Sequence, residues 1–137
     1  MNEKIKHLEF IQGIINRMAN DSFLLKGWSV TLLTVLFVFT VKEIENFNFL
    51  YVLIIIFPIF IFWILDGYFL SQERRFRDLY EHVRKLDEKN IDFSMDTIKY
   101  KDTPRNTWWG SIRSSTLLWF YIPLAVIVLI VLFSINK

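Results

Sequence analysis

The sequence predicts an all-α membrane protein: a membrane helical bundle with three transmembrane helices and a charged helical part outside the bilayer. Hydrophobic residues make up 53% of the 137 residues, above the roughly 45–50% that is usual for soluble domains. These residues are gathered into three blocks. Each block has about 20 residues, the number that a helix needs to cross a hydrocarbon core about 30 Å thick.

The three predicted spans cover residues 23–41, 49–70 and 116–137, and the first two form a transmembrane hairpin over residues 23–70. Lys26 is the one charged residue of the first span and Asp66 that of the second, and the third span carries only the terminal Lys137. The β-branched residues of these blocks do not indicate strands, because backbone polar groups in lipid must be satisfied within the segment. We therefore expect three helices.

Residues 1–22 are predicted to form an N-terminal amphipathic helix in the cytoplasm. Its apolar residues recur at helical spacing and form one stripe, made up of Ile5, Leu8, Ile11, Ile15 and Met18. Asp21 or Ser22 is expected to cap the first spanning helix and to change the chain direction there.

Residues 71–115 are predicted to form a cytoplasmic helix and a loop. The second spanning helix is expected to continue to about Glu88 with a length of about 60 Å, bending at Pro58 and Gly67. Its extension carries an apolar stripe that needs a partner, either the N-terminal helix or a neighbouring subunit. Residues 91–111 are rich in turn-forming types, which predicts an ordered loop.

The distribution of Lys and Arg predicts the orientation. Fourteen of them lie before or at the mouth of the first span or between the second and third spans, and only Lys42 and Lys137 lie on the other side. The positive-inside rule therefore places the N-terminus in the cytoplasm and the C-terminus outside. An aromatic belt is expected at the cytoplasmic interface, made up of Trp28, Trp63, Tyr68, Trp108, Trp109, Trp119 and Tyr121.

The residue types of the chain give little indication of a catalytic or metal-binding site. The chain has no Cys, and His7 and His82 are its only histidines. It has no Gly-rich phosphate loop, no nucleophile elbow and no metal-ligand spacing. We therefore expect neither an enzyme nor a resident cofactor or metal.

Two sets of charged residues are the candidate sites. Lys26 and Asp66 lie at matching depth, about 5 and 6 Å inside their spans. They are the candidate pore or gating charge pair. A salt bridge that fixes the bundle, snorkelling of Lys26, and a ring of charges around a symmetric pore are the three alternatives. The second set lies just beyond the second span and would bind either anionic lipid headgroups or a phosphate-rich ligand. It consists of Arg74, Arg75, Arg77, Arg84 and Lys85.

Three stretches resemble a family of small bacterial membrane proteins: FIQGIINRMANDSFLLKGWSVTL, LDGYFLSQERRFRDLYEHVRK and DFSMDT. Members of that family are similar to the membrane effectors of nucleotide-signalling antiphage systems, such as the channel subunit of the Hailong system. The resemblance implies a nucleotidyltransferase partner whose nucleotide or oligonucleotide product controls the effector, and an open effector that depolarises the cell. Gly67 and Phe69 replace the more usual Ala and Tyr. The positions that sit on the pattern are Lys26, Trp28, Asp66, Glu73, Arg74, Phe76, Arg77, Tyr80 and Arg84.

Residues and resemblance together predict an oligomeric pore-forming effector, an ion channel in antiphage defence that is gated by a phosphate-rich nucleotide or oligonucleotide. Three spans cannot enclose a conduit alone, so we expect a symmetric homo-oligomer in the lipid bilayer. The rival hypothesis is a non-conducting membrane scaffold that docks a soluble enzyme through its cytoplasmic helix. The rival explains the weakly polar spans better.

Overall fold

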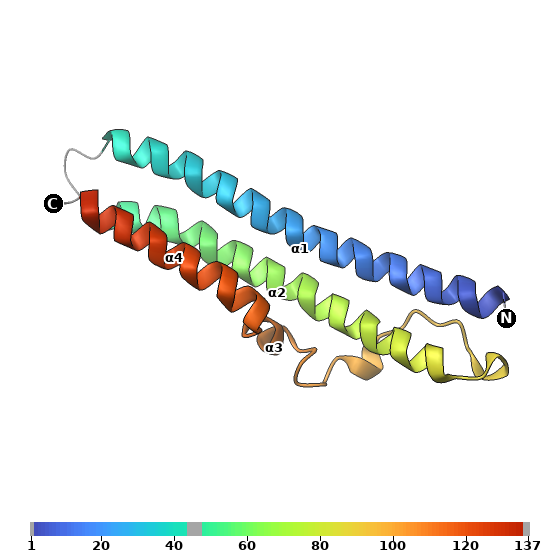
Figure 1. Ribbon diagram of the computed structural model, residues 1–137. Helices are drawn as coiled ribbons and strands as arrows, with labels where there is room; N and C mark the ends of the chain where they lie inside the picture. The colour runs from blue at the N-terminus through green and yellow to red at the C-terminus, as the bar shows by residue number, and fades with distance from the viewer. Residues whose placement is uncertain (1, 44–47, 136–137) are drawn as a thin grey trace.

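The computed structural model describes residues 2–43 and 48–135, and these residues form four α-helices and two short 3₁₀ turns (Figure 1). The helices are α1 (Asn2–Glu43), α2 (Phe49–Lys85), α3 (Trp108–Ile112) and α4 (Ser115–Ile135). Three of them, α1, α2 and α4, are long and apolar enough to cross a membrane. The predicted all-α fold with three such helices is confirmed. Residues 44–47, which connect the first two predicted spans, and the terminal Lys137 lie outside the described residues.

The first helix is continuous, which corrects the predicted boundary at Asp21 and Ser22. One helix of 42 residues runs through both positions. A capping side chain is useful only where backbone N–H groups lack an intrahelical partner, and here the helix has already begun at Asn2. The Ser22 hydroxyl is instead directed at Asp66 on α2. The N-terminal amphipathic segment and the first span are therefore parts of one continuous helix.

The second helix spans 37 residues and begins at a well-formed cap. The Asn48 side chain accepts a hydrogen bond from the backbone N–H of Leu50 at 3.2 Å. The helix continues through Pro58 and Gly67 and ends near the predicted position. At its end, Lys4 Nζ donates to the carbonyl oxygens of Arg84 and Leu86 at 3.1 and 2.5 Å. The start of α1 thus satisfies carbonyls that the end of α2 leaves free.

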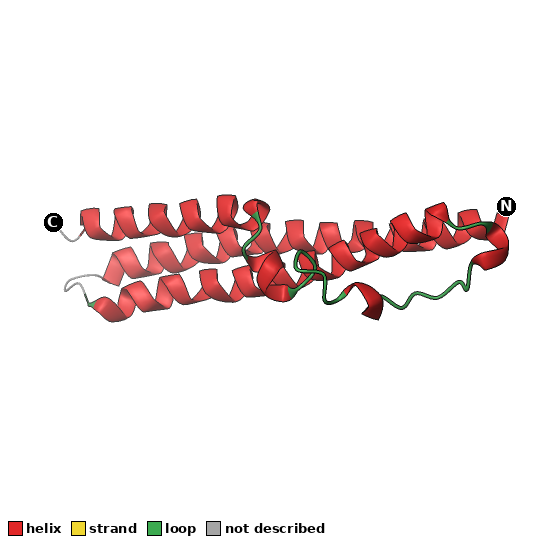
Figure 2. Ribbon diagram, turned by 90° about the horizontal axis from the view of Figure 1, so that it is seen from below, coloured by secondary structure: helices red, strands yellow, loops and turns green. Residues whose placement is uncertain are grey.

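We call the part formed by residues 2–22, 71–85 and 86–107 the stalk, and residues 86–107 the return segment. The return segment runs back along α2 toward α3 (Figure 2). It contains 3₁₀ turns at Glu88–Asn90 and Ile98–Tyr100 and no α-helix, as predicted for an ordered loop. Its last residues and the short helix α3 connect the stalk to α4. α4 begins at Ser115, and the hydroxyl of the preceding Ser114 accepts a hydrogen bond from the Leu117 N–H at 3.4 Å.

Two hydrophobic clusters hold the molecule together. The cluster in the stalk joins α1 to α2 and the return segment through Ile11, Ile15, Leu79, Val83 and Ile91. The apolar stripe of the α2 extension is therefore covered by the N-terminal part of α1, which was one of the two expected partners. The cluster between the spans joins all three long helices and contains Leu33, Val52, Ile55, Ile59, Leu117, Tyr121 and Leu132.

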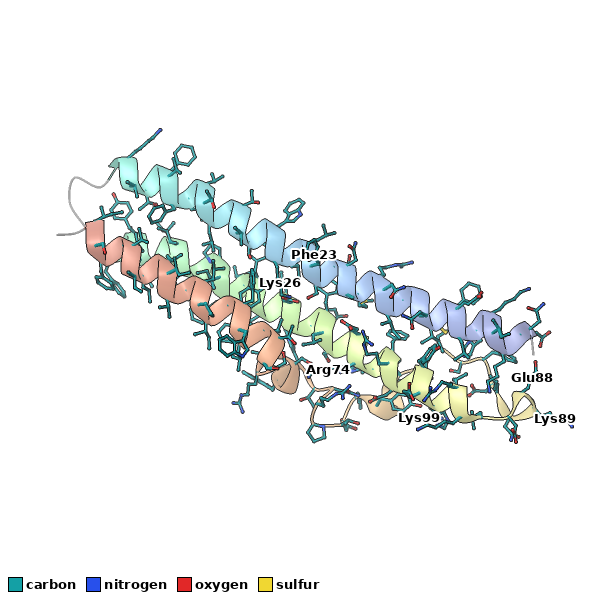
Figure 3. All side chains as sticks on the ribbon, in the orientation of Figure 1. Phe23, Lys26, Arg74, Glu88, Lys89 and Lys99 are labelled. Carbon is teal, nitrogen blue, oxygen red and sulfur yellow. The ribbon has the colours of Figure 1, made fainter. Side chains whose placement is uncertain are left out.

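The outer surface of the spans is strongly apolar. Large side chains such as Phe23, Phe57 and Ile127 are more than half exposed, and Figure 3 shows side chains projecting outward along all three long helices. A contiguous exposed apolar surface of this kind is expected of a protein whose solvent is lipid. Lys26 on α1 points into the bundle, where it reaches Asp66.

Candidate functional site

A buried carboxylate joins the three long helices where the stalk meets the spans. Asp66 on α2 is fully buried. Lys26 Nζ on α1 lies 2.5 Å from Asp66 Oδ2, and the Tyr121 hydroxyl on α4 lies 3.0 Å from the same oxygen. The Ser22 hydroxyl donates to Asp66 Oδ1. We call these four residues, Ser22, Lys26, Asp66 and Tyr121, the polar junction.

Helix geometry explains why these residues meet. Ser22 and Lys26 are four residues apart, so both side chains lie on one face of α1, and Lys26 Nζ also donates to Ser22 Oγ at 2.9 Å. On α4, Tyr121 stacks against the Trp63 ring with the ring centroids 6.1 Å apart and the planes within 9°. The ammonium of Lys26 lies 5.8 Å from the centre of the neighbouring Phe120 ring.

The polar junction satisfies a charge that would otherwise be costly. Removing an ion from water costs several kcal/mol even after relaxation, unless a partner and hydrogen bonds replace the solvent. Here the carboxylate has three donors, and the Lys26 side chain is only 19% exposed. Of the three alternatives for this pair, the structure shows the salt bridge within one subunit. The two charges compensate each other inside the bundle.

Two tryptophans tie the spans to α3. Trp63 Nε1 donates to the carbonyl oxygen of Ile112, and Trp108 Nε1 donates to that of Ile64, both at 3.0 Å. Gly67 permits this close approach, since a Cβ on it would lie 2.5 Å from Ile112 Cγ1. The residues of the expected aromatic belt fall into a group that faces the interior and a group that is exposed. Trp63 and Tyr121 face the interior, whereas Trp28, Tyr68, Trp108, Trp109 and Trp119 are exposed.

The predicted basic site is only partly open. Arg77 forms a salt bridge with Glu73 at 2.7 Å, and Arg84 forms one with Glu81 at 2.7 Å. Arg74 donates to the carbonyl oxygen of Arg105 at 2.6 Å. Burial lowers the pKa of Arg74, and the charge of Arg105 lowers it further. Each of these three arginines already has an acceptor within the chain.

The other two predicted basic residues differ in position. At 3.6 residues per turn, Lys85 shares one side of α2 with Arg74, Arg77 and Arg84. Arg75 lies about a quarter of a turn away from Arg74, and its Nε is buried with no hydrogen-bond partner among the described residues. The structure therefore gathers four of the five basic residues on one side and separates Arg75 from them.

Asn106 is a structural residue that the sequence did not single out. Its side chain is fully buried, and Nδ2 donates to Asp78 Oδ2 at 2.5 Å and to the Tyr100 carbonyl at 3.0 Å. Its own carbonyl accepts from Ser71 Oγ at 2.5 Å. Burial raises the pKa of the nearby Tyr100 phenol, and Asp78 raises it further. These contacts hold the return segment on α2, and a lone Asn in a turn-rich stretch gave no signal of it.

Comparison with known proteins adds no family. No family model, no curated protein and no solved structure matches the chain. Within the described residues, no three His, Asp or Glu side chains gather where they would hold a metal ion. The functional proposal therefore rests on the residues of the chain, their geometry and the sequence resemblance described above.

Proposed function

We propose that this chain is the subunit of an oligomeric pore in the bacterial inner membrane, and that a phosphate-rich nucleotide or oligonucleotide bound to the stalk controls its opening. The observation that carries this proposal is the continuity of α1 and α2. Each helix runs without a break from the stalk into the apolar half. In this proposal the open pore depolarises the cell in antiphage defence, an assignment that comes from the sequence resemblance.

Helix continuity couples the two halves mechanically. An α-helix bends sharply only where its hydrogen-bond ladder is disturbed, so a displacement of the stalk part of α1 moves its span as well. The polar junction lies at the transition and joins α1, α2 and α4. In the proposed mechanism, ligand binding shifts the stalk helices, and the polar junction acts as the pivot that holds them together.

The basic side of α2 can exchange its present partners for phosphate. The Arg84–Glu81 pair is exposed on both sides, and such pairs contribute only about 0–1 kcal/mol. A phosphate group carries more charge than a carboxylate and accepts bidentate hydrogen bonds from guanidinium groups. The proposed ligand site is therefore formed by Arg74, Arg77, Arg84 and Lys85, with Arg75, about a quarter of a turn from Arg74, as a supporting residue.

An oligomer is required because one subunit encloses no conduit. The interior between its three long helices is filled by the apolar cluster around Ile55, Ile59 and Leu117. The charges that would attract ions, Lys26 and Asp66, are buried inside the subunit. Ions must therefore pass between copies, as in other assemblies of small membrane chains with cyclic symmetry.

Flux through reconstituted vesicles tests the proposal. The purified protein is inserted into liposomes that carry a K⁺ gradient and a potential-sensitive dye, and a short oligonucleotide is added. We expect an oligomer in detergent and a flux that the oligonucleotide switches on or off. A monomer in detergent, or vesicles that stay tight with and without oligonucleotides and nucleotides, would contradict the pore.

A non-conducting scaffold is the second candidate, and one observation favours it. The hydroxyls of Thr31, Thr34 and Thr40 donate to carbonyl oxygens four residues earlier on their own helix, so they offer little to water. The scaffold predicts no flux under any condition. It also predicts that a soluble nucleotidyltransferase expressed with the chain binds the membrane, and that changes in the stalk release it.

A further inference from the structure

Arg74 differs from the other arginines on the basic side of α2, because no carboxylate balances its charge. Arg77 and Arg84 each form a salt bridge with a glutamate of the same helix. Arg74 donates instead to a neutral group, the backbone carbonyl oxygen of Arg105, at 2.6 Å (Figure 3). Among the described residues, no salt bridge joins Arg74 or Arg105 to an acidic side chain.

The return segment holds Arg105 beside Arg74. The next residue, Asn106, is fully buried; its side chain donates to Asp78 Oδ2 at 2.5 Å, and its carbonyl oxygen accepts from Ser71 Oγ at 2.5 Å. Both partners lie on α2, so the chain can leave this place only by breaking buried hydrogen bonds. Burial lowers the pKa of Arg74, and the charge of Arg105 lowers it further. Two like charges are therefore held close together.

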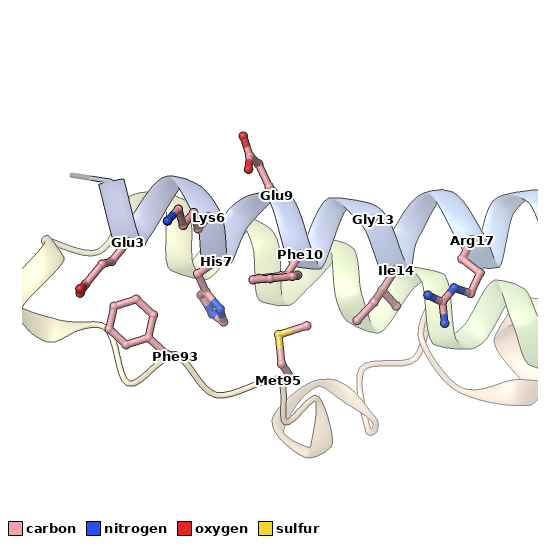
Figure 4. Close-up of a pocket in the computed structure, with 10 residues that line it drawn as sticks. All are labelled: Glu3, Lys6, His7, Glu9, Phe10, Gly13, Ile14, Arg17, Phe93 and Met95. Atoms are coloured by element: carbon pink, nitrogen blue, oxygen red, sulfur yellow. The ribbon is translucent and has the colours of Figure 1, made fainter.

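Charged side chains elsewhere on the stalk are balanced. An open groove of about 850 Å³ lies between α1 and the return segment (Figure 4). It is lined by two positive and two negative side chains, Lys6, Arg17, Glu3 and Glu9. Arg74 and Arg105 lack such compensation, and like charges at close range raise the free energy of the folded protein.

An anion placed between the two guanidinium groups would remove this repulsion. Each guanidinium presents a planar fork of N–H donors that matches the oxygens of a phosphate group. α2 supplies one fork and the return segment supplies the other, and the Arg105 side chain is exposed and open to a ligand. The shape and charge of the pair therefore favour phosphate.

We propose that Arg74 and Arg105 together form a clamp for one phosphate group. The inference rests on the proposed function for its phosphate-rich ligand, and it adds Arg105 to the ligand site. An anionic lipid headgroup is a second source of phosphate, since Arg74 lies only about 6 Å beyond the predicted end of the second span. In either case the bound group joins α2 to the segment that leads through α3 into α4.

Binding of inorganic tripolyphosphate tests the clamp. The full-length protein is kept in a maltoside detergent, which carries no phosphate, and binding is measured by isothermal titration calorimetry. Arg105→Gln should weaken binding by about tenfold or more, because charge-assisted hydrogen bonds are lost. Arg17→Gln is the matched control, since it removes the same charge from an exposed position at the balanced groove. Equal losses in the two variants would overturn the clamp.

A double variant tests whether both arginines hold the same group. Arg74→Gln and Arg105→Gln together should weaken binding by less than the product of their separate effects. Effects that multiply in full would show two independent sites and overturn the clamp.

The stability of the unliganded protein separates binding from folding. Arg105→Gln should leave the thermal unfolding midpoint unchanged or higher, because Arg74 keeps its carbonyl acceptor and a like-charge repulsion is removed. A lower midpoint with unchanged phosphate binding would show a structural role for Arg105 and overturn the clamp.

Phosphatidylglycerol distinguishes the two sources of phosphate. It is added to the same detergent solution in place of tripolyphosphate, and the unfolding midpoint is followed. Tripolyphosphate binding that depends on Arg105 assigns the clamp to a soluble ligand. Stabilisation by phosphatidylglycerol alone, lost in Arg105→Gln and kept in Arg17→Gln, assigns it to lipid. If Arg105→Gln changes the response to neither compound, the clamp is wrong.

The clamp and the pore fail separately. Oligonucleotide-controlled flux that is unchanged in Arg105→Gln retains the pore and removes the clamp. Phosphate binding through Arg105 in a protein that conducts under no condition retains the clamp and removes the pore.

Discussion

The hydroxyl of Tyr121 lies 3.0 Å from Asp66 Oδ2, and this contact connects the third span to a carboxylate that the first two spans already share. Both side chains are fully buried. The contact is the only polar link from α4 to the Lys26–Asp66 pair among the described side chains. It makes the junction a three-helix feature.

Tyr121→Phe should therefore weaken the attachment of α4. A hydrogen bond to a charged group contributes about 1.5–3 kcal/mol, and Phe keeps the ring that stacks on Trp63. We expect a lower midpoint of denaturant-induced unfolding in detergent, followed by circular dichroism. Tyr68→Phe is the control, because Tyr68 is exposed and its hydroxyl has no hydrogen-bond partner among the described residues. Equal midpoints for Tyr121→Phe and the wild type would show that the hydroxyl adds nothing.

Lys26 and Asp66 should behave as a coupled pair. Either single change to Ala strands a charge at the junction, which costs about 3–5 kcal/mol for a buried pair. The double change should cost less than the sum of the two. The exposed pair Glu81 and Arg84 is the matched control and should show coupling of at most about 0.5 kcal/mol. Additive effects for Lys26 and Asp66 would argue against their interaction in the membrane.

Gly110→Ala should disturb the connection between the return segment and α4. An added Cβ would collide with the backbone carbonyl oxygen of Pro104, which cannot move away easily. We expect a lower unfolding midpoint and faster proteolysis in the return segment. Gly13→Ala is the control, because its Cβ meets nothing within 4 Å and Ala is the better helix former. A Gly110→Ala protein as stable as the wild type would contradict the close contact.

The basic side of α2 should carry the ligand response. Changing Arg74, Arg77 and Arg84 to Ala should abolish the oligonucleotide effect on flux without removing the protein from the membrane. Log K for binding a single-stranded oligonucleotide falls linearly with the logarithm of the salt concentration. Each lost phosphate contact should make this slope shallower by about 0.7. If the variant causes no flux with or without the oligonucleotide, the ligand is an activator. If it depolarises and kills cells without any signal, the ligand is an inhibitor.

Two controls make this result specific. Arg77→Ala leaves the buried Glu73 without its partner, so the same variant is also made with Glu73→Gln. A triple change of the exposed Lys99, Lys101 and Arg113 to Ala removes the same charge elsewhere. An unchanged ligand response in the α2 variant, or an equal loss in the surface control, would rule out the α2 site.

The orientation should be N-terminus inside and C-terminus outside. This follows from the fourteen-to-two distribution of Lys and Arg and from three membrane crossings. A phosphatase reporter fused after Lys137 should be active, and the same reporter inserted near Lys101 should be inactive. The reverse pattern would invert the topology, and equal activity at both sites would contradict three crossings.

The sequence alone determined the helical class, the three spans, the long extension of α2 and the candidate pair Lys26 and Asp66. These features follow from local properties: block length, helical period and the rarity of charge in apolar segments. The absence of a break at Ser22 was not predictable in the same way. Whether a Ser caps a helix or binds a distant carboxylate depends on which partner the folded chain brings near.

Only the tertiary structure decided which side chains face one another. Tyr121 resembled an interfacial aromatic residue in the sequence, and Asn106 resembled an ordinary turn residue, yet both are fully buried. Their partners, Asp66 and Asp78, lie 55 and 28 residues away in the chain. Hydropathy identifies a helix that can enter lipid, because the free energy of transfer into the bilayer is set by each side chain separately and sums along the segment. A hydrogen bond depends on two atoms at one distance, which only the packing of the helices sets.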